Sequence, residues 1–264
     1  MREQNSGRLG RQEAAAAAGG VAIVIPAFDE AATIETIVRA CLALPGRPRV
    51  LVVDDGSTDE TAVLAAEAGA ELLPQATNRG KGDSLRRGMR AALAGGARWI
   101  VTLDADGQHR PEDVPRLLAA AAAWPGRLVI GARCSAGAGP VPRARRIANR
   151  VADFWISWAA RQKVPDSQSG FRVYPAALAA LLVQGGGQAE RFAFESEALI
   201  EAGRGGFGFV AVPIPAIYSP ALRPSHFRPV ADIARIVRMV AGRLLARGMD
   251  PVGLWQSLRR PPSQ

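Results

Sequence analysis

Two aspartates and a glutamine, Asp104, Asp106 and Gln108, stand at the end of an apolar run that begins at Trp99. A buried strand of this kind delivers its last side chains to the sheet edge where α/β proteins bind ligands. Carboxylate and amide oxygens are the hard donors that Mg²⁺ or Mn²⁺ prefers, and phosphate oxygens often complete the shell of such a cation. An isolated pair of acids after a strand is also typical of an ordinary acidic turn, so a metal–diphosphate site needs support from the rest of the chain.

Similar polar clusters follow two earlier apolar runs. Phe28, Asp29 and Glu30 follow the run 21–26, and Asp54-Asp55 follows the run 50–53. Each cluster alone could be a helix cap. Because the carboxyl ends of parallel strands meet at one sheet edge, the three clusters together predict a single ligand crevice, in which Asp54 could accept hydrogen bonds from a base or ribose.

The elements that must position these side chains alternate between strand and helix through the first half of the chain, which favours an α/β fold with a doubly wound, mostly parallel sheet flanked by helices. The second half is less regular and ends in a cationic amphipathic helix at 231–247. The expected strands of the first half are 21–26, 50–53, 72–73, 99–103 and 128–130, and the other expected elements are a helix at 144–160, an extended segment at 171–174 and a strand at 210–218.

Length and charge divide the 264 residues into three parts. We expect a disordered leader at 1–20, a catalytic domain at 21–223 and a basic amphipathic tail at 224–264. The net charge is +9, and the tail holds seven arginines against two acids. Such a tail suits a membrane surface, and it could equally pack on the body or on a second subunit. It lacks the interleaved aromatic residues of nucleic-acid binders.

Two cysteines do not form a disulfide framework, and no apolar run reaches the length of a membrane span. We therefore expect a cytoplasmic protein that is peripheral to the inner face of the membrane if its acceptor is a lipid.

Several ordered motifs resemble those of family 2 glycosyltransferases, and within that family the chain is similar to the dolichyl- and polyprenyl-phosphate sugar transferases. The similarity runs over about residues 21–220 in the family's order. It implies the nucleotide-diphospho-sugar transferase fold of the GT-A type. The residues that carry it are Pro26-Ala27-Phe28-Asp29-Glu30, Asp54-Asp55-Gly56-Ser57, Asn78-Arg79-Gly80-Lys81-Gly82, the DXD motif Asp104-Ala105-Asp106 with Gln108-His109, Asp166-Ser167-Gln168-Ser169-Gly170-Phe171-Arg172, and Phe194-Glu195-Ser196-Glu197.

The resemblance also implies a role for each matching residue. Asp104, Asp106 and Gln108 would bind the metal, Mg²⁺ or Mn²⁺. The catalytic residues would be Asp106, Asp166 and Arg172. The nucleotide-sugar would contact Pro26, Phe28, Glu30, Asp54, Asp55, Lys81, Asp104 and Arg133, and the acceptor would contact Arg145, Asn149, Gln168 and Glu197.

The activity that we expect is metal-dependent, inverting transfer of a hexose from a UDP or GDP sugar to a polyprenyl phosphate or related lipid. A phosphate monoester is already an anionic nucleophile and needs little help from a base, and arginines hold anions together well. A hydroxyl acceptor would instead need a general base, for which Asp166 and Glu197 are the candidates. A non-catalytic nucleotide-binding scaffold is the third possibility. The donor base and the oligomeric state stay open.

Overall fold

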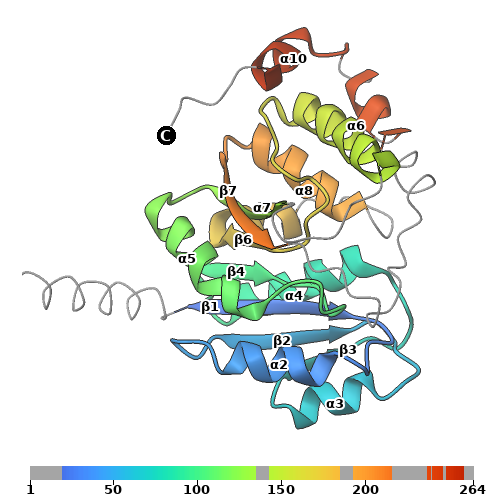
Figure 1. Cartoon of the computed structure of the whole chain (residues 1–264), viewed down its shortest axis with the longest axis vertical. Coiled ribbons are helices and arrows are strands. Elements are labelled where there is room, and N and C mark those ends of the chain that lie inside the picture. The colour runs from blue at the N-terminus through green and yellow to red at the C-terminus, as the bar shows by residue number, and fades with distance from the viewer. Residues whose placement is uncertain are drawn as a thin grey trace, which may run out of the picture.

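A computed structural model of the protein describes residues 20–134, 143–184, 193–215, 237–238, 240–245 and 248–258. Its centre is a seven-stranded sheet in the order β3-β2-β1-β4-β6-β5-β7 (Figure 1). Strand β6 runs antiparallel to both of its neighbours, and the other neighbouring pairs are parallel. The strands are β1 (Val21–Ala27), β2 (Arg49–Asp54), β3 (Glu71–Pro74), β4 (Trp99–Thr102), β5 (Leu128–Cys134), β6 (Arg172–Pro175) and β7 (Phe209–Pro215).

Helices cover both faces of this sheet because successive residues of a buried strand point to opposite sides. On β1, Ala22 and Val24 belong to one hydrophobic cluster and Ile23 and Ile25 to the other. The described helices are α2 (Ile34–Leu42), α3 (Thr61–Glu67), α4 (Lys81–Ala94), the short 3₁₀ helix η1 (Pro111–Asp113), α5 (Val114–Ala123), α6 (Arg143–Ala160), α7 (Ala176–Gln184), α8 (Ala193–Arg204) and α10 (Pro251–Leu258).

Helix α4 matters most for the site because it approaches the sheet closely. A Cβ atom added to Gly88 would lie 2.3 Å from Cγ1 of Val24 and 3.1 Å from Cγ2 of Val53. This close packing fixes the start of α4, with Lys81 as its first residue, beside the carboxyl ends of β1 and β4.

These elements confirm the expected alternation and the mostly parallel sheet. The extended segment at 171–174 becomes the antiparallel β6, and helices α7 and α8 were not expected from the sequence. Strand β7 reaches Pro215, and the remainder of the expected strand 210–218 lies outside the described residues. The expected leader also lies outside them, except for Gly20.

The described parts of the C-terminal tail pack on the body of the protein. Val240 and Leu244 are buried in the cluster on the α4 and α8 side of the sheet. The Trp158 indole of α6 donates a hydrogen bond of 3.0 Å to the backbone oxygen of Asp250, and Arg161 pairs with the Asp250 carboxylate at 2.7 Å. In the parts of the chain that the structure describes, none of the helices combines the length and the apolar character needed to cross a membrane.

Candidate functional site

The loops that follow β1 and β2 are tied together at the carboxyl edge of the sheet. Asp54 is buried at the end of β2, and its Oδ1 accepts a hydrogen bond from the Ser57 amide at 3.2 Å. Pro26 is buried in β1, while Phe28 and Glu30 are half-buried in the loop beyond it. These four side chains lie at one edge, as expected of a nucleotide pocket.

Asp55 has a structural task at this edge. Its carboxylate accepts hydrogen bonds from the backbone amides of Arg79 and Gly80, both at 2.8 Å, and from the Gln75 amide at 2.9 Å. Burial raises the pKa of Asp55, and these donors act in the opposite direction. Asp55 therefore holds the loop that leads into α4, which places Lys81.

Three charged side chains from distant parts of the chain meet beside this loop. The Lys81 ammonium lies 2.7 Å from Oδ1 of Asp104 and 2.9 Å from Oε1 of Glu195, and we call these residues the ion triad. Burial disfavours the charge of Lys81, but the two carboxylates outweigh it and raise the lysine pKa. Burial likewise disfavours ionised Asp104, and the Lys81 charge outweighs it and lowers the pKa of that carboxyl.

Gly170 closes the ion triad from the β6 side. A Cβ atom at this position would lie 2.7 and 2.8 Å from the two carboxylate oxygens of Asp104 and 2.9 Å from Oε1 of Glu195. The backbone oxygen of Gly170 accepts a hydrogen bond of 2.7 Å from the buried Thr102 hydroxyl. Only a residue without a side chain fits between the two carboxylates.

Asp106 and His109 lie next to the triad. The Asp106 carboxylate accepts a hydrogen bond of 3.0 Å from the Gln108 backbone amide, and its pKa is raised by burial and then by the charge of Asp104. His109 is 7% exposed, its ring packs edge-on at 5.4 Å from Phe171, and neither of its ring nitrogens has a hydrogen-bond partner. Burial lowers its pKa.

A divalent cation fits this donor set. Asp104 and Asp106 repel each other, Gln108 adds a neutral oxygen, and a cation would remove the repulsion that raises the Asp106 pKa. Within the described part of the chain, no group of three or more His, Cys, Asp or Glu side chains is arranged to hold a metal. A cation here would therefore rely on the two carboxylates, the amide and oxygens of a ligand.

Asp166 and Arg133 form a second polar pair at the same edge. Oδ2 of Asp166 accepts hydrogen bonds from the backbone amide and Nε of Arg133, both at 2.9 Å, and Oδ1 accepts one from Nη2 at 2.8 Å. Burial alone would raise the pKa of Asp166, but this guanidinium outweighs it and lowers the pKa. Gln168 is half-buried in the same loop.

Arg172 is fully buried behind that loop. Its guanidinium donates hydrogen bonds to the backbone oxygens of Ser169 and Glu195, each at 2.8 Å, and of Ser167 at 2.9 Å. This geometry fits a residue that positions the loop and the ion triad better than one that contacts substrate.

The residues expected to hold the acceptor are spread over two places. Asn149 is half-buried on α6, and the side chain of Arg145 lies outside the described residues. Glu197 lies apart from Asp166, paired at 2.6 Å with both Arg86 and Arg243. Its neighbour Glu195 is the residue that reaches the site, which sequence reasoning did not single out. The two glutamates are two positions apart on a helix and therefore point in different directions, so only one of them can face the triad.

The comparisons with known proteins decide the family. The family model described as "Glycosyl transferase family 2" matches residues 22–179. The chain belongs to this family. Family 2 members are glycosyltransferases, and this chain is therefore one as well.

Two curated relatives show which members of family 2 this chain is similar to. The undecaprenyl-phosphate mannosyltransferase of Micrococcus luteus is 31% identical over 74% of this chain and 82% of its own. The UDP-N-acetylglucosamine–dolichyl-phosphate N-acetylglucosaminyltransferase of Methanococcus voltae is 29% identical over 75% of this chain and 85% of its own. These names confirm the resemblance to dolichyl- and polyprenyl-phosphate sugar transferases.

A similar solved structure is glucosyl-3-phosphoglycerate synthase from Mycobacterium tuberculosis in complex with Mn²⁺, UDP and phosphoglyceric acid. It has a TM-score of 0.66 and 24% identity, and the match covers 89% of this chain and 81% of that one. The likeness confirms the expected GT-A type of fold for this family 2 enzyme.

Proposed function

We propose that this enzyme transfers a hexose from a UDP or GDP sugar to a polyprenyl phosphate, with inversion at the anomeric carbon. In this reaction the bond from the sugar to the diphosphate breaks, an oxygen of the acceptor phosphate forms the new bond, and a nucleoside diphosphate leaves. The curated relatives described above, which act on undecaprenyl and dolichyl phosphates, support the acceptor class.

The donor would bind where β1, β2 and β4 end. Pro26, Phe28, Glu30 and Asp54 would line the base and ribose, and Arg133 would face the diphosphate. Asp104, Asp106 and Gln108 would hold Mg²⁺ or Mn²⁺, which when bound would neutralise the charge that develops on the leaving diphosphate. The Lys81 ammonium, 2.7 Å from Asp104, keeps that carboxylate ionised and ready for a cation.

The choice of a phosphate acceptor rests on the contacts of the two candidate bases, Asp166 and Glu197. Asp166 accepts three hydrogen bonds from Arg133, which lowers its pKa and makes it a poor proton acceptor. Glu197 is held by two arginines and is 7% exposed. Neither of these two groups is placed to act as the base that a hydroxyl acceptor would need, whereas a phosphate acceptor needs no such base.

The remaining parts of the proposal concern acceptor contacts and location. Arg145 and Asn149 on α6 and Gln168 in the loop before β6 would bind the acceptor phosphate. The enzyme would work as a peripheral protein at the cytoplasmic face of a membrane. A scaffold without catalysis is disfavoured because Lys81, Asp104 and Asp106 form a charged cluster that a purely structural protein has no need to bury.

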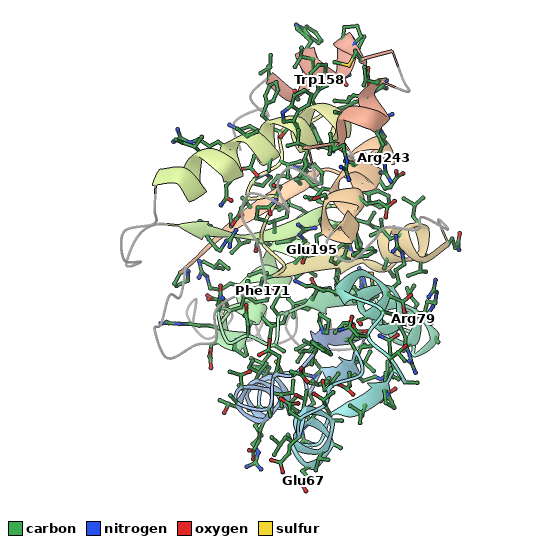
Figure 2. The ribbon with its side chains drawn as sticks, turned by 90° about the vertical axis from the view of Figure 1, so that its right-hand side faces the viewer. Glu67, Arg79, Trp158, Phe171, Glu195 and Arg243 are labelled. Atoms are coloured by element: carbon green, nitrogen blue, oxygen red, sulfur yellow. The ribbon has the colours of Figure 1, made fainter. Side chains whose placement is uncertain are left out.

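The test is a donor panel. Purified protein would be incubated with undecaprenyl phosphate, Mg²⁺ or Mn²⁺, and radiolabelled UDP-glucose, UDP-N-acetylglucosamine or GDP-mannose. We expect labelled lipid phosphate from one of these donors, and a loss of about 100-fold or more in Asp106→Asn. Glu67→Gln, an exposed carboxylate far from the edge, is the matched control (Figure 2). No labelled lipid with any donor, or full activity in Asp106→Asn, would contradict the proposal.

A further inference from the structure

Large apolar side chains are exposed along the outer side of α6. Ile147, Val151 and Phe154 are 63%, 41% and 42% exposed, and their spacing places them on one stripe of the helix. A second group of exposed apolar side chains lies in the tail, at Leu245, Met249, Val252, Trp255 and Leu258. Exposed apolar residues that gather in this way mark an interaction surface more often than residues scattered singly.

The two groups are joined by an aromatic cluster. The Phe154 ring lies 5.7 Å from the ring of Trp155 and 6.1 Å from that of Trp158, and Trp158 is hydrogen-bonded to the backbone of Asp250 just before α10. Figure 1 shows α6 and α10 together at the end of the molecule opposite α2 and α3, and Figure 2 shows Trp158 and Glu67 at opposite ends. We call α6 together with Leu245 and residues 248–258 the docking face.

The charges of the docking face favour an anionic partner. Residues 143–163 include six basic residues and a single acid, Asp153. That acid accepts a hydrogen bond from the Ser167 amide, and Asp250 is 7% exposed and pairs with Arg161 and Arg204. Both acids therefore turn inward, while Arg150 and Lys163 are exposed.

We propose that the docking face lies on an anionic lipid bilayer, with Phe154 and Trp255 at the level of the headgroups. Exposed apolar and aromatic side chains surrounded by arginines bind such surfaces through both apolar burial and attraction to anionic lipids. A second copy of the chain would bring the same positive charges and be repelled. The inference rests on the proposed lipid-phosphate acceptor, because it places α6, which carries Arg145 and Asn149, where the phosphate of a polyprenyl phosphate is anchored.

The experiment is co-sedimentation of the full-length protein with vesicles. The vesicles contain phosphatidylcholine alone or mixed with phosphatidylglycerol. We expect binding to the mixed vesicles, and binding at least about tenfold weaker for the triple variant Ile147→Ser, Phe154→Ser and Trp255→Ser. The double variant Val63→Ser and Leu181→Ser removes apolar side chains that are 58% and 43% exposed on other elements, and it should bind like the wild type.

Two further readouts keep the result decisive. Trp255→Leu retains an apolar side chain, so binding should persist while quenching of tryptophan fluorescence by brominated lipids falls. Sugar transfer to a short water-soluble isoprenyl phosphate should be unchanged in the triple variant. If transfer fails with every acceptor while vesicle binding behaves as expected, the proposed function fails and the docking face stands.

Three results would overturn the docking proposal. They are equal vesicle binding by the wild type and the triple variant, equal loss in the control variant, and a dimer in vesicle-free solution that the triple variant dissociates. The last result would assign the face to a second copy of the chain.

Discussion

Replacing Lys81 by methionine tests the ion triad directly. The substitution keeps the length of the side chain and removes the cation, so the Asp104 and Glu195 carboxylates face each other without compensation. Removing one partner of a fully buried ion pair costs about 3–5 kcal/mol. Since the Lys81 and Asp104 side chains are 26% and 21% exposed, solvent reduces this cost, and we expect a loss of about 2 kcal/mol in the free energy of unfolding near pH 8.

The stability lost in Lys81→Met should depend on pH. In the wild type the pKa of Asp104 is lowered by folding. Its pairing with Lys81 therefore stabilises the fold at pH values above the ordinary carboxyl pKa, and this stabilisation is lost as the pH falls through the pKa that Asp104 has in the folded protein. In Lys81→Met the Asp104 carboxylate gains a proton more readily than in the unfolded chain, because burial raises its pKa and the lysine charge no longer lowers it. The difference between variant and wild type should therefore be largest near pH 8 and shrink as the pH falls towards about 5.

Urea unfolding at several pH values, with EDTA or with Mn²⁺, measures this difference. Mn²⁺ should restore part of the lost stability because a divalent cation at Asp104 and Asp106 takes over the compensation. Lys163→Met is the matched control, since Lys163 is exposed and is the other lysine of the chain. A loss that is independent of pH, or equal to that of the control, would refute the reasoning.

Three further substitutions probe the same edge of the sheet. Gly170→Ala pushes a methyl group to within 3 Å of the triad carboxylates, so kcat/KM should fall about tenfold or more and the urea midpoint should fall as well; unchanged kinetics and stability would show that the triad can shift freely. Glu197→Gln breaks two arginine pairs and should lower the free energy of unfolding by about 2 kcal/mol, with kcat per folded molecule retained; a selective loss of kcat would argue for a role in the site. Asp166→Asn weakens the pair with Arg133 and should lower kcat about tenfold while the acid limb of the pH profile persists; disappearance of that limb would identify Asp166 as a general base.

Much of the site could be predicted from the sequence because its residues follow strands. The apolar run before Asp104 and the run before Asp54 each indicate a buried strand, and parallel strands bring their ends to one edge. The DXD motif and Gln108 are local features of one turn, and the spacing alone indicates oxygen donors for a cation.

The long-range partners could not be predicted in the same way. Nothing near Lys81 in the sequence indicates that Glu195, from a helix far along the chain, completes its ion pairs. The same holds for Arg133 and Asp166, which meet because β6 is inserted antiparallel between β4 and β5. Periodicity predicts elements, whereas the order of strands depends on packing over the whole sheet.

Glu197 shows that the sequence does not indicate which of two nearby acids reaches the site. The segment Phe194-Glu195-Ser196-Glu197 offers two acids, and their order along the helix does not indicate which faces the site. The structure places Glu195 beside Lys81 and Glu197 beside Arg86 and Arg243, so the second acid ties the tail to the body.

The central claim is that the acceptor is a lipid phosphate and that no base is needed to activate it. The most direct test is a competition in one reaction, with equal amounts of undecaprenyl phosphate and undecaprenol and the labelled donor that the panel identifies. We predict that the label enters the phosphate-linked product alone and is released by mild acid. Label on the alcohol, as an acid-stable glycoside, would contradict the account.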